Sequence, residues 1–341
     1  MRYQRKSATP RARARRARLV LGLMLALLAG GGAHSRVVVD EHVIGRSDKY
    51  LVVVPRPGDD YAALALRYLR DPARAWQIED ANDSAPLQAL DTVVVPLGAP
   101  EPGGFYGDSY QTVPILAYHK FGDTPSPMTV TREMFLAQMQ YLAEHDYRVV
   151  RLRDLPDFLA GRKALPQRAV IITFDDGHQS IYRVAFPVLK RFGFPATLFI
   201  YTDYIENGGL KWDQLGEMID SGLFELQPHS KTHANLAVRW DDESDKRYAE
   251  RLDQETRLSG QKLREHLVDP LYAFAYPYGD ANDQVIDVLR GEGYALGLTV
   301  MRGANATFAP PFLLRRNMIF GTRGMAQFRE ALIVRQQLDA Q

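Results

Sequence analysis

Residues 168–177 read Arg-Ala-Val-Ile-Ile-Thr-Phe-Asp-Asp-Gly. The β-branched run 168–173 has the length and composition of a buried strand, so Asp175 and Asp176 follow its C-terminal end. An Asp-Asp-Gly triplet by itself is most often a solvated turn. Its place after a strand favours a catalytic role, because catalytic residues in parallel α/β folds gather at the C-terminal ends of strands.

Two histidines occupy an equivalent position further along the chain. His229 and His233 follow a second predicted strand at 224–227, and they would share one face if their segment were helical. With two carboxylates, two imidazoles can bind one divalent metal such as zinc and leave one base free. A bound metal lowers the pKa of its water to about 7, and a nearby carboxylate can take the proton. These residues predict metal-assisted hydrolysis of a carbonyl-type bond.

The region from residue 112 to the C-terminus alternates strands and helices, which predicts a parallel sheet closed or nearly closed into a barrel. No glycine-rich phosphate loop is present in it, so nucleotide use has no support. The predicted strands are 113–118, 147–150, 168–173, 196–200, 224–227, 272–275, 295–299 and 312–315. The predicted helices are 132–144 with Thr131 as N-cap, 154–159, 179–192, 212–221, 245–266, 283–290 and 325–336.

A smaller unit at 50–97 precedes this region, after a loosely structured lead at 34–49. It is predicted to be a βααβ domain, with strands at 50–55 and 92–96 and helices at 61–68 and 73–81. It resembles a LysM module in Tyr50, Val52, Pro57-Gly58-Asp59, Leu64, Ala65, Tyr68, Ile78, Ala81-Asn82, Leu90 and Val93–Pro96. The resemblance implies binding of N-acetylglucosamine polymers such as peptidoglycan or chitin. The alternative is a spacer with no affinity for sugar. Residues 98–111 are predicted to be a linker, because Gly and Pro are frequent in their first half.

The start of the chain has the pattern of an export signal. Residues 1–33 contain eight Arg and Lys and no Asp or Glu, and an 11-residue apolar run at 19–29 precedes Gly30–Ala33. This pattern predicts a secretory signal peptide, with an uncleaved membrane anchor as the alternative. The protein is then exported to the periplasm, cell envelope or exterior, and it touches a membrane only through this segment.

Composition and charge limit the domain number, the binding partners and the metal ligands that this chain can have. The 341 residues are 46% hydrophobic and 24% charged, an ordinary globular balance that allows two domains. The net charge is +1, and without the basic leader the remainder carries −7, which gives no support to nucleic-acid binding. The chain has no cysteine, so disulfides and thiolate metal ligands are excluded.

Residues 113–320 resemble the NodB-homology polysaccharide deacetylases, which are metal-dependent carbohydrate esterases. Three motifs carry the resemblance: Thr173–Gly177, His229–His233 and Tyr276-Pro277-Tyr278-Gly279. The resemblance implies a distorted (β/α) barrel over 112–341, and removal of acetyl groups from N-acetylglucosamine residues of a polysaccharide.

The same resemblance implies individual roles. Asp175 is expected to be the catalytic base, and Asp176, His229 and His233 are expected to bind one metal, most often Zn²⁺. The backbone N–H of Tyr278 is expected to help hold the oxyanion that forms on the amide carbonyl.

The chain departs from the family pattern at two places. Ala275 stands where the third motif often has an arginine, and Leu296-Gly-Leu298-Thr stands where a Leu-x-His motif supplies the general acid. His119, at the end of strand 113–118, is the first candidate for the acid; a structural histidine is the alternative. Arg316 is the candidate to replace the missing arginine and orient Asp175; a surface arginine is the alternative.

Several further residues have two possible roles. His178 is a weaker acid candidate and fits a turn residue better. Tyr118, Trp212 and Tyr276 could stack on sugar rings or belong to the core, and Leu296 and Leu298 could line an acetyl pocket or belong to the core. The sequence also leaves open whether the polymer is peptidoglycan or an exopolysaccharide. Two alternative functions remain, a non-catalytic glycan-binding protein and an O-acetyl polysaccharide esterase.

Overall fold

A computed structural model describes residues 40–338. The predicted signal segment 1–33 lies outside the described residues. Among residues 40–338, no helix combines the length and apolar character that a membrane crossing needs.

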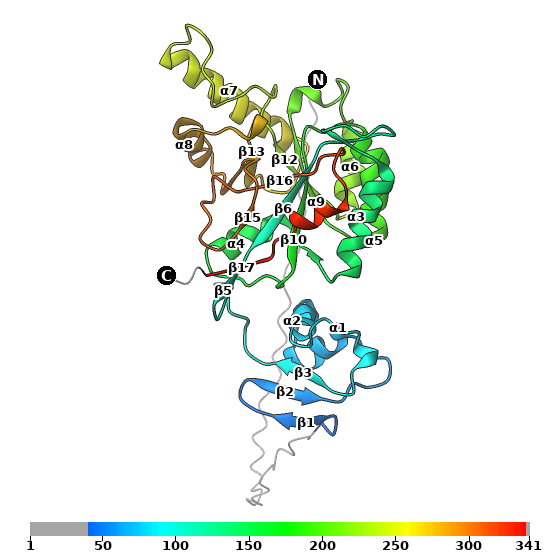
Figure 1. Ribbon diagram of the computed structural model, residues 1–341. Helices are drawn as coiled ribbons and strands as arrows, with labels where there is room; N and C mark the ends of the chain where they lie inside the picture. Colours follow the sequence, from blue (N-terminus) through cyan, green and yellow to red (C-terminus); the bar gives the residue numbers. More distant parts are fainter. Residues whose placement is uncertain (1–39, 339–341) are drawn as a thin grey trace, which may run out of the picture. The chain divides into compact units, whose positions relative to one another are not determined.

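The N-terminal module is a three-stranded antiparallel sheet with helical segments packed on it (Figure 1). The strand order is β1 (Val43–Arg46), β2 (Tyr50–Val53) and β3 (Val93–Pro96). Between β2 and β3 lie α1 (Tyr61–Leu64), a π-helical turn (Ala65–Leu69), a 3₁₀ turn (Pro72–Arg74), α2 (Ala75–Asp80) and a second 3₁₀ turn (Leu87–Ala89). The module therefore has the predicted elements and one additional strand, since β1 forms where an irregular lead was expected. Its core includes Val53, Leu64, Ile78 and Val93, all fully buried.

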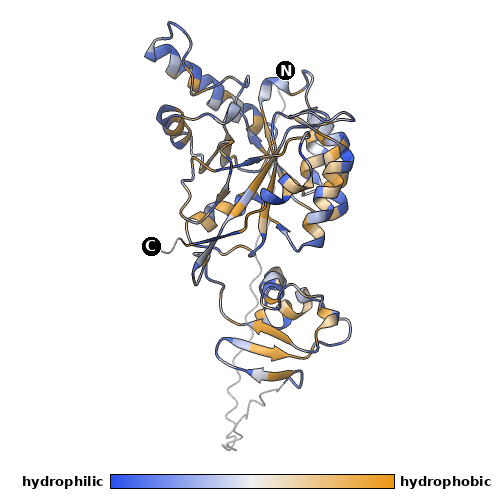
Figure 2. Ribbon diagram, viewed as in Figure 1, coloured by the Kyte–Doolittle hydropathy of each residue, from blue (hydrophilic) through white to orange (hydrophobic). Residues whose placement is uncertain are grey.

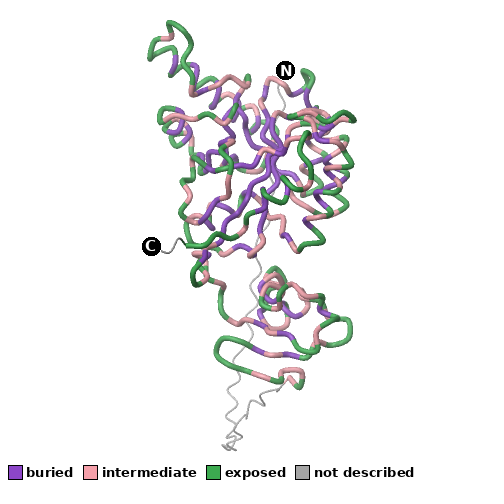
Figure 3. The backbone as a smooth tube through the Cα atoms, viewed as in Figure 1, coloured by how far each residue is buried: buried purple, intermediate pink, exposed green. Residues whose placement is uncertain are grey.

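The second region is built on a parallel sheet. Its central strands run in the order β12 (Phe224–Pro228), β11 (Ala196–Ile200), β10 (Ala169–Phe174) and β6 (Val113–Tyr118). Short strands extend it: β16 (Asn317–Met318) pairs parallel with β6, β15 (Ala304–Asn305) pairs antiparallel with β6, and β9 (Arg148–Val149) pairs with β10. Every residue of β6, β10, β11 and β12 is buried (Figure 3). This burial explains the nearly continuous apolar sequences of β6, β10 and β11, because helices cover parallel sheets on their faces. Strand β12 alternates apolar residues with Glu225 and Gln227, whose buried side chains are hydrogen-bonded.

The helices lie close to their predicted positions and turn apolar faces inward (Figure 2). They are α3 (Arg132–Glu144), α4 (Leu155–Leu159), α5 (Phe186–Phe192) after a π-helical turn (Ile181–Ala185), α6 (Trp212–Asp220), α7 (Asp245–Arg264), α8 (Asp283–Gly291) and α9 (Met325–Glu330). Further 3₁₀ turns lie at Leu152–Asp154, Thr202–Tyr204 and Pro277–Gly279. The predicted N-cap of α3 is confirmed, because the Thr131 side chain accepts a hydrogen bond from the Met134 N–H.

The ring of strands is distorted rather than closed by one continuous ladder of hydrogen bonds within the described residues. β13 (Ala273–Ala275) and β14 (Leu296–Leu298) form a separate parallel pair. On one side, the Gln227 side chain of β12 accepts hydrogen bonds from the N–H groups of Tyr272 and Ala273. On the other side, the Leu314 N–H donates to the Gly297 carbonyl. Side-chain and isolated backbone bonds thus join β13 and β14 to their neighbours.

Two predicted elements near the C-terminus are wrong in extent. Residues 312–315 form only an isolated bridge through Leu314, and the described strand β16 lies two residues later. The predicted helix 325–336 ends at Glu330, because the following backbone is used for tertiary pairing. The Thr112 N–H and hydroxyl donate to the carbonyls of Val334 and Ile333.

The same pairing orders part of the predicted linker 98–111. Strand β17 (Arg335–Gln337) pairs antiparallel with β5 (Ser109–Gln111), which in turn pairs with β4 (Phe105–Tyr106). The second half of that segment is therefore a hairpin. A further short pair, β7 (Lys120–Phe121) with β8 (Thr129–Val130), follows β6.

Candidate metal centre and active site

The Asp-Asp pair lies in a sharp turn at the C-terminal end of β10. The Asp175 N–H continues the strand ladder by donating to the Tyr118 carbonyl at 2.9 Å, and its side chain is buried. Asp176 and Gly177 have φ of 71° and 90°. At position 177 a Cβ atom would lie 2.4 Å from the Ile200 side chain, so only glycine fits there. This turn sends the two neighbouring carboxylates in different directions.

Arg316 holds Asp175 in a two-pronged ion pair. Both of its terminal nitrogens lie 2.7 Å from the two carboxylate oxygens, and the guanidinium is fully buried. Its Nε donates to the Thr299 carbonyl at 2.9 Å. Arg316 therefore lies where the sequence analysis expected it, in contact with Asp175. The planar guanidinium fixes the orientation of the carboxylate through two parallel bonds.

The histidines are positioned by β12 and by the loop that follows it. The His229 N–H donates to the Ile200 carbonyl, and its ring Nδ1 lies 2.7 Å from the Ala275 carbonyl. Because a carbonyl only accepts, Nδ1 carries the proton and Nε2 is left free as a ligand. Residues 229–233 are not helical, as Ser230 and His233 have φ of 70° and 66°. A strained loop, rather than one face of a helix, thus brings the two imidazoles together.

Asp176, His229 and His233 converge on one point. Their potential ligand atoms all lie within 4.8 Å of one another. Asp176 Oδ1 is 3.7 Å from His229 Nε2 and 3.3 Å from His233 Nε2. The same oxygen is buried without a hydrogen-bond partner among the described residues. One carboxylate oxygen and two imidazole nitrogens form the donor set of a three-residue zinc site that leaves a position for water, so these residues fit a divalent metal.

The ionisation of the site suits metal binding. Burial lowers the pKa of His229 to about 3 and also lowers the pKa of His233, so both imidazoles are neutral at pH 7. Burial raises the pKa of Asp176 to about 6, against the opposing charge of His119. Burial by itself also raises the pKa of Asp175. The charge and hydrogen bonds of Arg316 outweigh this effect and hold that pKa at about 2.

A family model described as polysaccharide deacetylase matches residues 162–297, which contain the Asp-Asp turn and both histidines. The poly-beta-1,6-N-acetyl-D-glucosamine N-deacetylase of Staphylococcus epidermidis is 31% identical over 204 residues, a match that covers 56% of this chain and 68% of that protein. The chain belongs to the polysaccharide deacetylase family.

Two further comparisons of this polysaccharide deacetylase, one of sequence and one of structure, support the same family. The poly-beta-1,6-N-acetyl-D-glucosamine N-deacetylase of Escherichia coli K12 is 28% identical over 255 residues, and the match covers 63% of this chain but only 37% of that protein. The structure of IcaB from Ammonifex degensii superposes with a TM-score of 0.58 at 30% identity, covering 65% of this chain and 97% of that one. The mixed α/β fold therefore matches that of the IcaB structure.

The remaining predicted site residues of the deacetylase lie around the same point. His119 follows the C-terminal end of β6, and its charge lowers the pKa of both Asp175 and Asp176. Tyr278 has φ of 61° and is 61% exposed, with its ring 4.8 Å from that of His233.

The other candidate residues lie in the core or make contacts with neighbouring side chains. His178 Nδ1 is hydrogen-bonded to Ser180 within the turn after Gly177. The core contains Leu296, Leu298, Tyr118 and Tyr276, and the hydroxyls of the two tyrosines bond to Gln138 and to the Phe312 carbonyl. Trp212 stacks on His266 with ring centroids 3.7 Å apart. Tyr118 and Tyr276 are fully buried and offer no exposed face to a sugar, whereas Trp212 is half-buried.

Sequence reasoning missed Glu255, which lies on α7 and contacts the loop between the two histidines. A glutamate in a polar helix gives no signal of such a contact.

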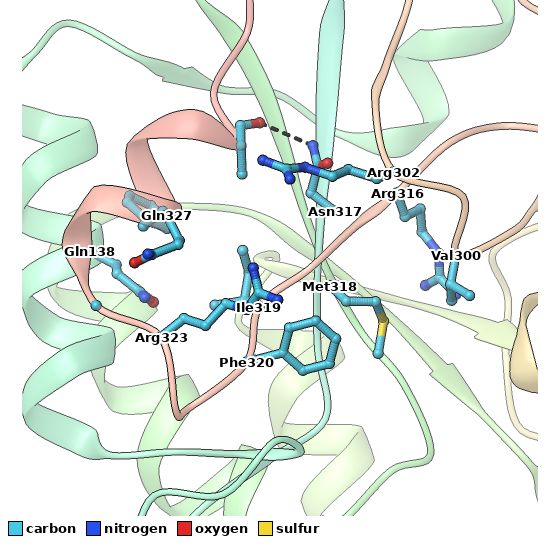
Figure 4. Close-up of a pocket in the computed structure, with 13 residues that line it drawn as sticks. Gln138, Val300, Arg302, Arg316, Asn317, Met318, Ile319, Phe320, Arg323 and Gln327 are labelled. Atoms are coloured by element: carbon cyan, nitrogen blue, oxygen red, sulfur yellow. Dashed lines mark hydrogen bonds between the residues drawn. The ribbon is translucent and has the colours of Figure 1, made fainter.

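Arg316 also lines a separate cavity of about 190 Å³ (Figure 4). Its walls come from Gln138, Val300, Arg302 and ten of the residues between 316 and 331. Asp176, His229 and His233 are not among its lining residues, so it is distinct from the candidate metal centre.

Proposed function

We propose that this protein is a metal-dependent N-deacetylase that acts on an N-acetylglucosamine polysaccharide. The observation that carries the proposal is the convergence of Asp176, His229 and His233 beside the buried Asp175–Arg316 pair. The names of the S. epidermidis and E. coli relatives favour poly-β-1,6-N-acetylglucosamine as the polymer over peptidoglycan. Zn²⁺ is the proposed metal, since nitrogen and oxygen ligands in a three-residue set suit it.

The chemistry assigns a task to each residue. Asp176, His229 and His233 hold the metal, which when bound polarises the amide carbonyl and lowers the pKa of the attacking water. Asp175 takes the proton of that water, in the orientation that Arg316 imposes. The backbone N–H of Tyr278 donates to the carbonyl oxygen as negative charge develops on it.

Departure of the sugar amine requires a proton. His119 is the proposed donor, because it follows the C-terminal end of β6, the strand that pairs with β10, and because Leu298 occupies the position of the missing family histidine. Acetate and a free amine on the polymer are the products.

Acetate release tests this function directly. The zinc-loaded chain is incubated with poly-β-1,6-N-acetylglucosamine, purified peptidoglycan and O-acetylated xylan in parallel. We expect release from the first polymer, loss of release with a chelator, and recovery on adding Zn²⁺. Release only from O-acetylated xylan would identify an esterase. Bound metal without release from any polymer would identify a glycan-binding protein.

We also propose that residues 50–97 bind glycan and keep the deacetylase near its polymer. A tethered binding module raises the effective concentration of substrate only when both sites can engage one molecule. Removing residues 41–97 is therefore expected to lower turnover of the long polymer and leave turnover of a short soluble oligosaccharide unchanged. Equal turnover of the long polymer by both forms would make the module a spacer.

We also propose that the protein is exported, because residues 1–33 have the pattern of a secretory signal peptide. N-terminal sequencing of the mature protein checks it, and a start at or near residue 34 is expected. An intact leader would support the membrane anchor instead.

A further inference from the structure

The loop that carries His233 is hydrogen-bonded to the buried carboxylate of Glu255. The backbone N–H groups of Lys231 and Thr232 both donate to Glu255 Oε2, at 3.0 and 2.8 Å. The Thr232 hydroxyl donates to Glu255 Oε1 at 2.6 Å. Glu255 belongs to α7 and is only 6% exposed. One carboxylate therefore satisfies three donors of the five-residue segment between and including the two histidines.

This segment needs such support. Ser230 and His233 both have φ near 70°, a left-handed conformation that costs free energy for residues other than glycine. The His233 N–H donates to Ser230 Oγ at 2.9 Å, which links the residues next to Glu255 with the imidazole itself. A loop in this conformation persists only when its surroundings hold it.

Two other side chains of α7 donate hydrogen bonds to backbone carbonyls of the residues that follow His233. Arg251, one turn before Glu255 and on the same helix face, donates to the carbonyls of Asn235 and Val238 at 3.3 and 2.9 Å. The Tyr248 hydroxyl donates to the Leu236 carbonyl at 2.6 Å. A carboxylate that accepts from N–H groups and a guanidinium that donates to carbonyls thus fix one continuous stretch of backbone against α7.

We propose that α7 is a positioning element of the metal centre and that Glu255 is its principal residue. By fixing the backbone of residues 231 and 232, Glu255 holds His233 Nε2 within reach of Asp176 Oδ1. The inference rests on the metal site of the proposed function. Glu255 does not itself contact the metal ligand atoms; it acts through the loop.

We expect the hydrogen bonds of Glu255, rather than its negative charge, to hold the loop in place. A glutamine at 255 can place its carbonyl oxygen against the two N–H groups and donate its NH₂ to the Thr232 hydroxyl. An alanine leaves all three donors without this partner. Glu255→Gln should therefore preserve most of the function that Glu255→Ala removes.

Zinc affinity of the full chain, measured by competition with a chelator, tests the proposal. We expect Glu255→Ala to weaken Zn²⁺ binding about 10- to 100-fold, the usual effect of losing a residue that orients metal ligands, and Glu255→Gln to restore most of it. Glu225→Ala is the matched control, since Glu225 is also buried and accepts hydrogen bonds from Thr197, Tyr272 and Arg153. It should lower the melting temperature without changing the affinity for Zn²⁺.

The outcomes separate this inference from the proposed function. A wild-type chain that binds no Zn²⁺ overturns the metal site itself. Wild-type affinity in Glu255→Ala, or an equal loss of affinity in Glu225→Ala, overturns only the role of α7. If Glu255→Ala does not fold, Thr232→Ala removes one of the three bonds without altering the helix. Unchanged Zn²⁺ affinity in that variant contradicts the proposal, and a smaller weakening supports it.

Discussion

Asp175→Asn is expected to lower the rate of acetate release by a factor of about 10² to 10⁴, the usual contribution of a general base. The amide cannot take a proton from water, while its size and one oxygen are kept. Arg316 keeps that oxygen as an acceptor but loses its second acceptor and its counter-charge, so the variant is expected to melt at a lower temperature than the wild type. Its folding and its Zn²⁺ binding are therefore checked before kcat is compared. The measurement is kcat on poly-β-1,6-N-acetylglucosamine with metal content determined in the same preparation.

The control for this variant is Asp157→Asn. Asp157 pairs with Arg162 on the surface of the domain and should show unchanged kcat. Retained turnover in Asp175→Asn would exclude Asp175 as the base. His119→Gln tests the proton transfer to the leaving sugar amine. If His119 is the acid, kcat is expected to fall while Zn²⁺ binding stays intact.

Asp175 is a better position for this test than Arg316. Removing one partner of a buried ion pair typically costs about 3–5 kcal/mol, because the other charge is left unpaired. Asp175→Asn and a variant of Arg316 both break this pair, but Asn leaves the guanidinium one acceptor, so it is expected to cost less stability. A variant of Arg316 would lose activity through misfolding as well as through misorientation of Asp175, and kcat alone could not separate the two effects.

His229→Ala is expected to weaken Zn²⁺ binding by more than the roughly 100-fold that loss of an outer-shell partner causes. The substitution deletes one of three donors, at a side chain that is 2% exposed and fixed by its bond to the Ala275 carbonyl. The measurement is bound metal per chain after dialysis, together with the absorption spectrum of the Co²⁺-substituted protein.

His145→Ala supplies the control, since His145 is an exposed imidazole at the end of α3 that stacks on Tyr141. It should bind Zn²⁺ like the wild type. Full metal occupancy in His229→Ala with normal activity would show that His229 is not a ligand and that the donor set is wrong.

The sequence by itself was enough for most elements and for the residues that converge at the candidate metal centre. The apolar runs of β6, β10 and β11 predicted buried parallel strands, because such strands carry few polar residues. Strand β12 was predicted as a short strand although it contains Glu225 and Gln227. The Asp-Asp turn and the two histidines were predictable because each follows the end of such a strand. Arg316 could be proposed as the partner of Asp175 because it lies near the end of the last predicted strand.

Other features depended on contacts between residues far apart in the chain. The helix 325–336 is cut short at Glu330 because backbone groups of 333–337 pair with Thr112 and β5, and no local pattern reports that pairing. The exclusion of Tyr118 and Tyr276 from sugar binding was decided by packing, since an aromatic residue at a strand end fits a core and a binding site equally well in sequence.

The geometry of the metal centre was decided in the same way. The sequence provides His229 and His233 four positions apart, but only the tertiary structure bends their loop through two left-handed residues and holds it on Glu255. The candidate ligands could be found in the sequence because each follows the end of a predicted strand. The residues that orient them are distant, because hydrogen bonds to a loop can come from any element that packs beneath it.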